Sequence, residues 1–249
     1  MFCNGFCNAY RNVFRNGFRA AILVVLLACA GFAQSFQEAD HLFTYGDDTG
    51  RDQQALAVIE KALASDGNNY QWLWRAARAR YYIGDEAPAA AKLKHFESGI
   101  AYAQRAISQL PNAVEGHFWL GANYGGYSQV KGAFSALTTV KKIRVEMEIV
   151  LRLNAAYADG SAYLALGELD RQLPRLLGGS VKRAITRLEQ GVKSAPRNLD
   201  MKYALAEAYQ DDGRIEDARR QLNELTQAAA RNRADRNVQE KARRLLAKL

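Results

Sequence analysis

Cysteine is missing from residues 30–249, because the three cysteines of the chain, Cys3, Cys7 and Cys29, all precede them. Without that amino-terminal stretch the chain has no thiol, which excludes disulfides and thiolate catalysis. Proline is also rare, with 4 residues among 249. Alanine, leucine, arginine and glutamate, which favour helix, are abundant. The composition therefore predicts an all-α protein.

Histidine is equally scarce. The three histidines, His41, His95 and His117, stand alone, outside the spacings with which histidine and cysteine bind metal. No serine stands in the G-x-S-x-G pattern of a hydrolase. The stretch LLGGSVKRAI, residues 176–185, lacks the spacing of a Walker loop, so we interpret it as a turn with Ser180 as a helix N-cap. We expect no metal, no cofactor and no enzyme.

A long apolar run is lacking beyond residue 33. The run AAILVVLLACA, residues 20–30, follows Arg11, Arg15 and Arg19 and precedes small residues. This order is typical of a secretory signal, and the run is about half the roughly 20 residues of a membrane-spanning helix. We assign residues 1–33 to a signal peptide and residues 34–249 to a single domain exported to the periplasm. A transmembrane anchor is the alternative.

Cys29 raises the alternative that the exported chain carries a lipid. LLAC, residues 26–29, resembles a bacterial lipobox, in which the cysteine is acylated and becomes the new amino terminus. The mature protein is then either soluble or held at the membrane by a lipid on Cys29.

Acidic residues are outnumbered. The net charge of +8 falls to +5 without the three leader arginines, and residues 214–249 alone hold ten Lys or Arg against five Asp or Glu. The excess is thus a basic carboxyl-terminal tail, which is usually a solvated helix face. Nucleic acid is not expected as a partner of an exported protein.

A repeat takes the place of catalytic motifs. From Leu199 onward, small and large apolar residues recur at the positions of the 34-residue tetratricopeptide repeat (TPR), two antiparallel helices joined by a turn. The matching residues are Leu205, Ala206, Tyr209, Ala218, Leu222 and Leu225. The signature recurs upstream, and successive repeats end at Gly67, Pro111, Ala155, Pro196 and Ala230. We predict a tetratricopeptide-repeat superhelix with a carboxyl-terminal capping helix at about residues 234–249.

Three repeats are longer than the unit. The repeat-ending residues are spaced by 44, 44, 41 and 34 residues. The surplus falls between the two helices of a repeat, at about residues 84–94, 127–139 and 170–179. Because per-repeat insertions lie on one face, we expect these segments to fold over the superhelix and to enclose an apolar cavity.

Aromatic residues gather in the first helices of successive repeats, which line the concave face of such a superhelix. Each of them is either a consensus core residue, which is the commoner case, or part of the cavity wall. The residues expected to bind a ligand there are Trp74, Tyr81, Trp119, Tyr127, Phe134 and Tyr163.

Residues 116–196, which include YADGSAYLALGELDRQLP followed by LGG, resemble the T component of TRAP transporters, the tripartite ATP-independent periplasmic systems. The resemblance implies a periplasmic lipoprotein whose divergent repeats wrap an apolar pore. It also implies a trimer, a periplasmic solute-binding protein as partner and a hydrophobic small molecule as ligand. The chain also has a weaker resemblance to the regulator of microtubule dynamics family, and the export signal argues against a cytosolic role.

Two functions of different class follow. The first is a ligand-handling accessory of a periplasmic, TRAP-type transport system. The alternative is an envelope scaffold for protein–protein interaction, whose concave groove binds a peptide or a partner helix. An enclosed apolar cavity favours the first function, and a polar concave face favours the second.

Overall fold

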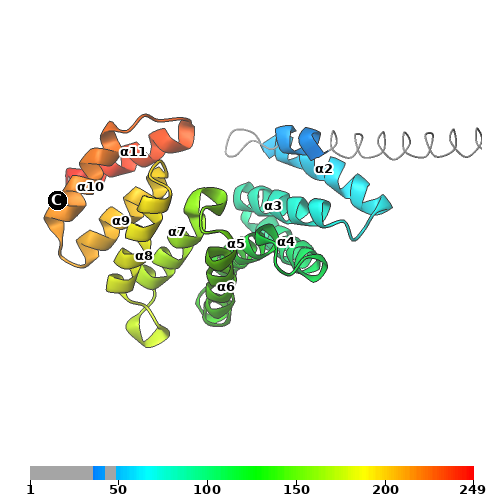
Figure 1. Cartoon of the computed structure of the whole chain (residues 1–249), viewed down its shortest axis with the longest axis horizontal. Coiled ribbons are helices and arrows are strands. Elements are labelled where there is room, and N and C mark those ends of the chain that lie inside the picture. The colour runs from blue at the N-terminus through cyan, green and yellow to red at the C-terminus, as the bar shows by residue number, and fades with distance from the viewer. Residues whose placement is uncertain (1–35, 43–48) are drawn as a thin grey trace, which may run out of the picture.

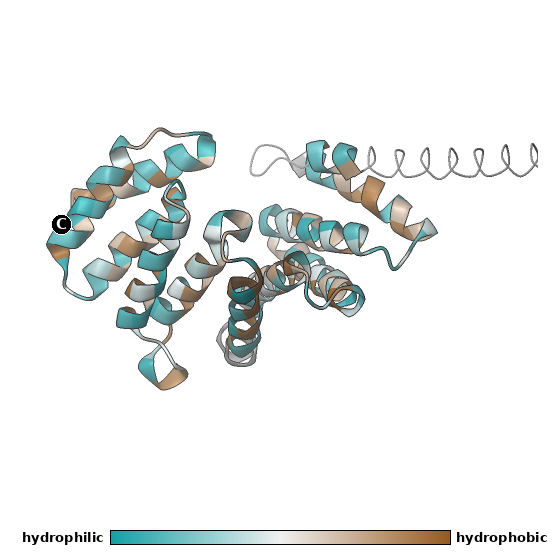
Figure 2. Ribbon diagram, in the orientation of Figure 1, coloured by the Kyte–Doolittle hydropathy of each residue, from teal (hydrophilic) through white to brown (hydrophobic). Residues whose placement is uncertain are grey.

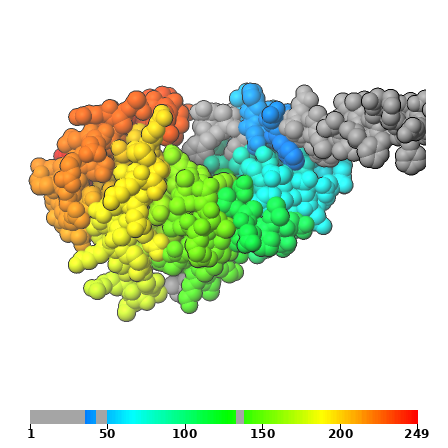
Figure 3. All heavy atoms as spheres, in the orientation of Figure 1, coloured from blue at the N-terminus to red at the C-terminus, as the bar shows by residue number. Residues whose placement is uncertain are grey.

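The computed structural model describes residues 36–42 and 49–249, except for the side chains of residues 49 and 133–137. Every regular element within these residues is helical. Pairs of antiparallel helices stack side by side, in chain order, into an arch that runs from α2 (Thr49–Ser65) to α11 (Arg233–Leu246), as Figures 1 and 3 show. The predicted tetratricopeptide-repeat superhelix is confirmed.

The helices alternate between two layers. The first-helix layer, named for the first helix of each hairpin, holds α3 (Tyr70–Glu86), α5 (Val114–Lys131), α7 (Tyr157–Gln172) and α9 (Leu199–Asp211). The second layer holds α2, α4 (Ala89–Gln109), α6 (Ala133–Asn154), α8 (Val181–Ser194) and α10 (Ile215–Gln227). Within the first-helix layer α3 packs beside α5 and α7 beside α9, and α11 packs on α9 and α10 at the end of the array.

Helices end where the repeat predicts. The helices α2, α4, α6, α8 and α10 end one to three residues before Gly67, Pro111, Ala155, Pro196 and Ala230. The four prolines all stand outside helix interiors, where their missing N–H breaks no helical hydrogen bond. Ser180 accepts a hydrogen bond from the backbone N–H of Arg183 at 3.3 Å. The interpretation of LLGGSVKRAI as a turn with a serine N-cap is therefore confirmed.

The inserted segments differ from our expectation. Residues 84–94 and 127–139 do not fold over the superhelix, because most of them continue α3, α4, α5 and α6 (Figure 1). As a result α4 has 21 residues and α6 has 22, whereas α9 and α10 have 13 each. The run AAAKLK at residues 89–94 consists of strong helix formers, which explains why it lengthens a helix. Residues 170–179 contain the short 3₁₀ turn η1 (Arg175–Leu177).

Apolar side chains fill the space between the two layers, and each helix alternates hydrophobic and hydrophilic residues accordingly (Figure 2). Glycine lets the helices of a hairpin approach closely. A Cβ atom at Gly121 would stand 2.6 Å from Cε of Met147, and one at Gly167 would stand 2.6 Å from Cγ of Leu188. These are the close contacts that the small residues of the repeat consensus predict.

The connection between α6 and α7 interrupts the regular pattern. Ala158 and Asp159, with φ of 50° and 56°, and Gly160, with φ of 72°, are consecutive left-handed residues. This conformation costs roughly 1–2 kcal/mol for each residue other than glycine. The side-chain amide of Asn198 donates a hydrogen bond to the carbonyl oxygen of Asp159 at 2.8 Å and holds this elbow against the start of α9.

A buried ionic cluster joins α6, α7 and α8 near the carboxyl end of α7. The carboxylate of Asp170 in α7 is inaccessible to solvent. It accepts contacts of 2.7, 2.6 and 3.0 Å from Arg144, Arg183 and Arg187, which come from α6 and α8. One carboxylate therefore ties three helices together.

Several predictions concern residues outside this description, namely the signal peptide at residues 1–33 and the lipid on Cys29. Among residues 36–42 and 49–249, the longer helices are all too polar to cross a bilayer.

Candidate functional site

The first-helix layer brings three of the six predicted site residues together. Trp74 and Tyr81 in α3 and Trp119 in α5 belong to, or pack against, one hydrophobic cluster. The ring centroids of Tyr81 and Trp119 are 5.8 Å apart. Trp74 is 8% exposed and Trp119 is 5% exposed, so both indoles serve the packing of α3 against α5.

The aromatic row continues into α7. The ring of Phe118 lies 5.0 Å from that of Trp119 and 5.2 Å from that of Tyr157, which precedes the elbow. The hydroxyl of Tyr70 donates to the Glu115 carboxylate at 2.7 Å. Burial raises the pKa of Tyr157 to about 12, and burial together with Glu115 raises the pKa of Tyr70. Both phenols therefore remain protonated hydrogen-bond donors at neutral pH.

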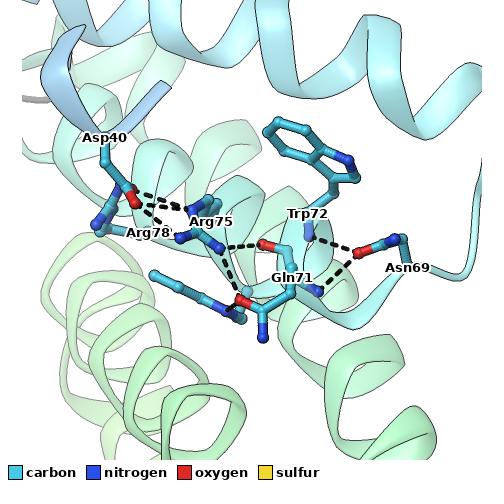
Figure 4. Close-up of polar contacts among 7 residues, drawn as sticks. Asp40, Asn69, Gln71, Trp72, Arg75 and Arg78 are labelled. Atoms are coloured by element: carbon cyan, nitrogen blue, oxygen red, sulfur yellow. Dashed lines mark hydrogen bonds and ion pairs between the residues drawn. The ribbon is translucent and has the colours of Figure 1, made fainter. Parts of the chain in front are cut away.

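A pair of arginines covers this cluster and holds a carboxylate from a distant segment (Figure 4). Residues 36–42 are helical and lie against α3. Its Asp40 accepts from Nε of Arg75 at 3.0 and 3.2 Å, from Nη2 of Arg75 at 2.7 Å and from Nη2 of Arg78 at 2.5 Å. Burial raises the pKa of Asp40, but the two arginines outweigh it and hold this pKa below its ordinary value. We call Arg75, Arg78 and the indole of Trp74 the arginine cradle.

The cradle is oriented by its own helix. The guanidinium carbons of Arg75 and Arg78 lie 4.2 and 5.1 Å from the centroid of the Trp74 ring, within the range of cation–π attraction. Gln71 accepts from Nη1 of Arg75 at 2.8 Å and from the indole N–H of Trp74 at 3.0 Å. The ring of Trp74 and the side chain of Gln71 therefore help to hold the arginine donors toward Asp40.

The other predicted site residues lie elsewhere. Tyr163 packs in a second cluster, formed mainly by α8 and α9. Tyr127 lies near the end of α5, where Nζ of Lys131 stands 5.9 Å from its ring. The side chain of Phe134 is outside the described part. The six residues thus remain a prediction as a ligand site, and those that are described do not share one cluster.

An open pocket of about 320 Å³ forms where two inserted segments meet. It lies between the far ends of the hairpin α3–α4 and of α5, and none of the six residues lines it. Its lining residues are Asp85, Ala89, Lys92, Phe96, Gly126, Gln129 and Val130.

In the carboxyl-terminal half, a group of ionic side chains joins α7 to α9. Arg171 in α7 contacts Glu168 at 3.0 Å, and it reaches Glu207 and Asp211 of α9 at 3.2 and 3.1 Å. The three carboxylate side chains are 26–42% exposed. We call these four residues the ionic strip, and they give the first-helix layer an excess of negative charge here.

The arginine cradle and the ionic strip were not predicted from the sequence. Arg75 and Arg78 stand one helical turn apart beside two tryptophans, and this local signal could have suggested a cation–aromatic surface. Their partner Asp40 lies 35 residues earlier than Arg75, at a distance that only the tertiary fold reveals. Among the residues described, no group of three or more His, Cys, Asp or Glu side chains is placed to hold a metal ion.

Comparison with solved structures places the fold. It is similar to TTC0263, a thermophilic TPR protein of Thermus thermophilus, with a TM-score of 0.58 and 22% identity over 78% of this chain and 91% of that chain. It is also similar to MamA, with a TM-score of 0.52 and 17% identity over 83% of this chain and all of that chain. The protein is therefore a TPR superhelix.

The family follows from the sequence. The model of the family described as regulator of microtubule dynamics protein 1-3 matches residues 35–249, and the chain belongs to this family. A search of curated protein sequences found no match.

The resemblance of residues 116–196 to the T component of TRAP transporters was wrong as a family assignment, and the weaker resemblance was the right one. That stretch is largely tetratricopeptide consensus, which serves helix packing in any such array and so does not separate one family from another. The trimer, the solute-binding partner and the hydrophobic ligand rested on the TRAP resemblance and gain no support from the family found.

Proposed function

We propose that this protein is a non-catalytic scaffold that binds a segment of a partner protein along its first-helix layer. The observation that carries the proposal is the ionic strip, in which one guanidinium lies among three partly exposed carboxylates of α7 and α9, two helices of the first-helix layer. Extended surfaces of this kind are what helical repeat arrays use to bind other chains.

The polarity of this surface favours a protein segment over an apolar ligand. An apolar molecule would remove from water three carboxylates that share the single guanidinium of Arg171, and it would supply no further partner, which is costly. Lysine and arginine side chains of a peptide would instead form charge-assisted hydrogen bonds with them. This is the scaffold function that the sequence offered as its alternative, and it replaces the transport accessory.

A photo-cross-linking experiment tests the scaffold. Tyr203, partly buried beside Glu207 in α9, is replaced by a photoreactive phenylalanine, and Lys193, exposed on α8 in the second layer, is replaced in the same way as the matched control. We expect one partner to be linked from position 203 and not from position 193. The charge reversal Glu207→Lys should weaken this product. Equal labelling from both positions, or no product, would contradict the proposal.

The description of the family adds the microtubule as a candidate partner, and location decides whether the two can meet. We propose an exported site of action, which rests on the leader pattern of residues 1–33. Mass spectrometry of the mature amino terminus tests this. A terminus near Gln34 or an acylated Cys29 supports export, whereas a cytoplasmic chain that retains Met1 contradicts it and makes co-sedimentation with microtubules the next experiment.

A further inference from the structure

We propose that the arginine cradle is a binding site for a helix of a partner protein that presents an aromatic residue and a carboxylate one turn apart, and that residues 36–42 are the chain's own occupant of this site. The inference deepens the proposed function, on which it rests, by naming the chemistry of a partner. It is carried by the contacts of Asp40, Arg75 and Arg78.

The side chains of residues 36–42 indicate which chemical groups the site binds. Asp40 is held by four short contacts from two guanidinium groups, in the forked geometry that arginine offers to carboxylates. Four residues earlier, the ring of Phe36 lies 4.3 Å from that of Trp72, and Ala39 between them is fully buried. An aromatic side chain and a carboxylate at i and i+4 on one helix face therefore fit this surface.

The cradle requires an anion. The side chains of Arg75 and Arg78 are only 10% and 16% exposed, and each guanidinium repels the other. While residues 36–42 cover them, these charged groups are largely removed from water, and Asp40 supplies the anion that such buried charges need. A partner helix that covers the arginines in the same way must also supply a carboxylate, so the site prefers acidic partners.

The occupant holds the site through two side chains. Phe36 packs on Trp72, and Asp40 pairs with the two arginines. The side chain of Asp40 is 37% exposed, so a competing carboxylate can reach this ion pair from solvent. A helix of a partner protein that presents the same two groups competes for the same contacts.

The test uses the full chain and a fluorescein-labelled peptide of sequence QSFQEADHLF, which corresponds to residues 34–43. Binding is measured by fluorescence anisotropy for the wild-type, Asp40→Asn and Phe36→Ala chains. We expect the peptide to bind the Asp40→Asn chain about tenfold more tightly than the wild type, because the internal carboxylate no longer competes. Phe36→Ala, which leaves the arginines and Asp40 intact, should give a smaller gain.

Matched variants separate the cradle from general charge effects. Glu38→Gln removes an exposed carboxylate of the same segment and should leave the affinity at the wild-type level. Adding Arg78→Gln to Asp40→Asn should abolish binding. Adding Arg80→Gln to Asp40→Asn should leave binding unchanged, because the guanidinium of Arg80 pairs with Glu60 of α2 and not with Asp40. A peptide with asparagine in place of its aspartate should not bind.

The outcomes below test the inference and the proposed function, once circular dichroism shows that each variant keeps its helix content. Equal, weak binding to the wild-type, Asp40→Asn and Phe36→Ala chains would mean that residues 36–42 are a fixed part of the fold and would overturn the inference. Binding that survives Arg78→Gln would do the same. If the peptide binds none of the chains while the cross-link from position 203 still forms, only this inference is overturned. If the peptide binds as expected but no cross-link forms from position 203, only the proposed function is overturned.

Discussion

Gly99 of α4 lies against Asn123 of α5 so closely that a Cβ atom on Gly99 would stand 2.0 Å from Oδ1 of Asn123. Asn123 is fully buried, and its side-chain amide donates to the carbonyl oxygens of Ala77 at 3.1 Å and of Trp119 at 2.8 Å. The asparagine thus joins α3 to α5 within the first-helix layer, and the missing side chain of Gly99 makes the room for it.

This contact predicts the effect of Gly99→Ala. The new methyl group cannot be accommodated unless Asn123 gives up its hydrogen bonds, so we expect a loss of about 1–3 kcal/mol in the free energy of unfolding. Gly125→Ala in α5 is the matched control, because no heavy atom lies within 4 Å of its Cβ position. It should stabilise the protein by about 0.5–1 kcal/mol. Denaturant unfolding measures both, and equal stability of Gly99→Ala and the wild type would refute the argument.

A second prediction concerns the buried carboxylate of Asp170. Asp170→Asn leaves three arginines of α6 and α8 without their anion, so the free energy of unfolding should fall by about 3–5 kcal/mol. Asp211→Asn removes an ion pair whose carboxylate is 42% exposed, and its cost should stay below about 1 kcal/mol. Thermal unfolding of the two variants provides the comparison, and similar melting temperatures would count against the role of Asp170 as a tie between helices.

The same carboxylate predicts a pH dependence. Burial raises the pKa of Asp170, but hydrogen bonds from Arg183 and Arg144 outweigh it and hold the pKa below its ordinary value. Its contribution to stability is therefore complete above the unfolded pKa of about 3.9 and is lost as the pH falls through the lower folded pKa. The difference in melting temperature between the wild type and Asp170→Asn should be constant near neutral pH and shrink below about pH 4. A constant difference down to about pH 2 would be inconsistent with this ionisation.

The elbow in the first turn of α7 gives a fourth prediction. Ala158 has a left-handed φ of 50°, and glycine adopts this conformation without strain. Ala158→Gly should therefore raise the free energy of unfolding by up to about 1 kcal/mol. Ala162→Gly, at a buried position of the regular part of α7, should lower it by about 1 kcal/mol or more. Chemical denaturation distinguishes the two, and a destabilising Ala158→Gly would show that the elbow is not strained.

The helical repeat could be predicted from the sequence because its signal is local. Small residues such as Gly121 and Ala206 each stand 10 residues after a turn proline, Pro111 and Pro196, and this spacing places each helix end within three residues. The location of the inserted segments followed from the same spacing. Their conformation did not, because we gave the position of insertions more weight than the helix propensity of AAAKLK at residues 89–94.

The candidate site was predicted only in part, for a physical reason. Trp74 and Trp119 were recognised because aromatic residues stand out in the first helices. Their ionic neighbours were not predicted. An ion pair such as that of Asp40 with Arg75 depends on how the chain folds back over α3, and it produces no periodic pattern in the sequence. The elbow at Ala158 is equally invisible in the sequence, since two of its three left-handed residues are not glycine.

The docked segment also has a mechanical consequence. Phe36 and Asp40 precede the first hairpin, and the contacts of Asp40 with Arg75 and Arg78 close a loop of the chain over α3. Tension applied to the chain ahead of Phe36 would load these contacts first, and the helix pairs behind them would bear it only after the segment had come away. For a chain tethered by its amino terminus, the pulling force would then set how often the arginines are open to another protein.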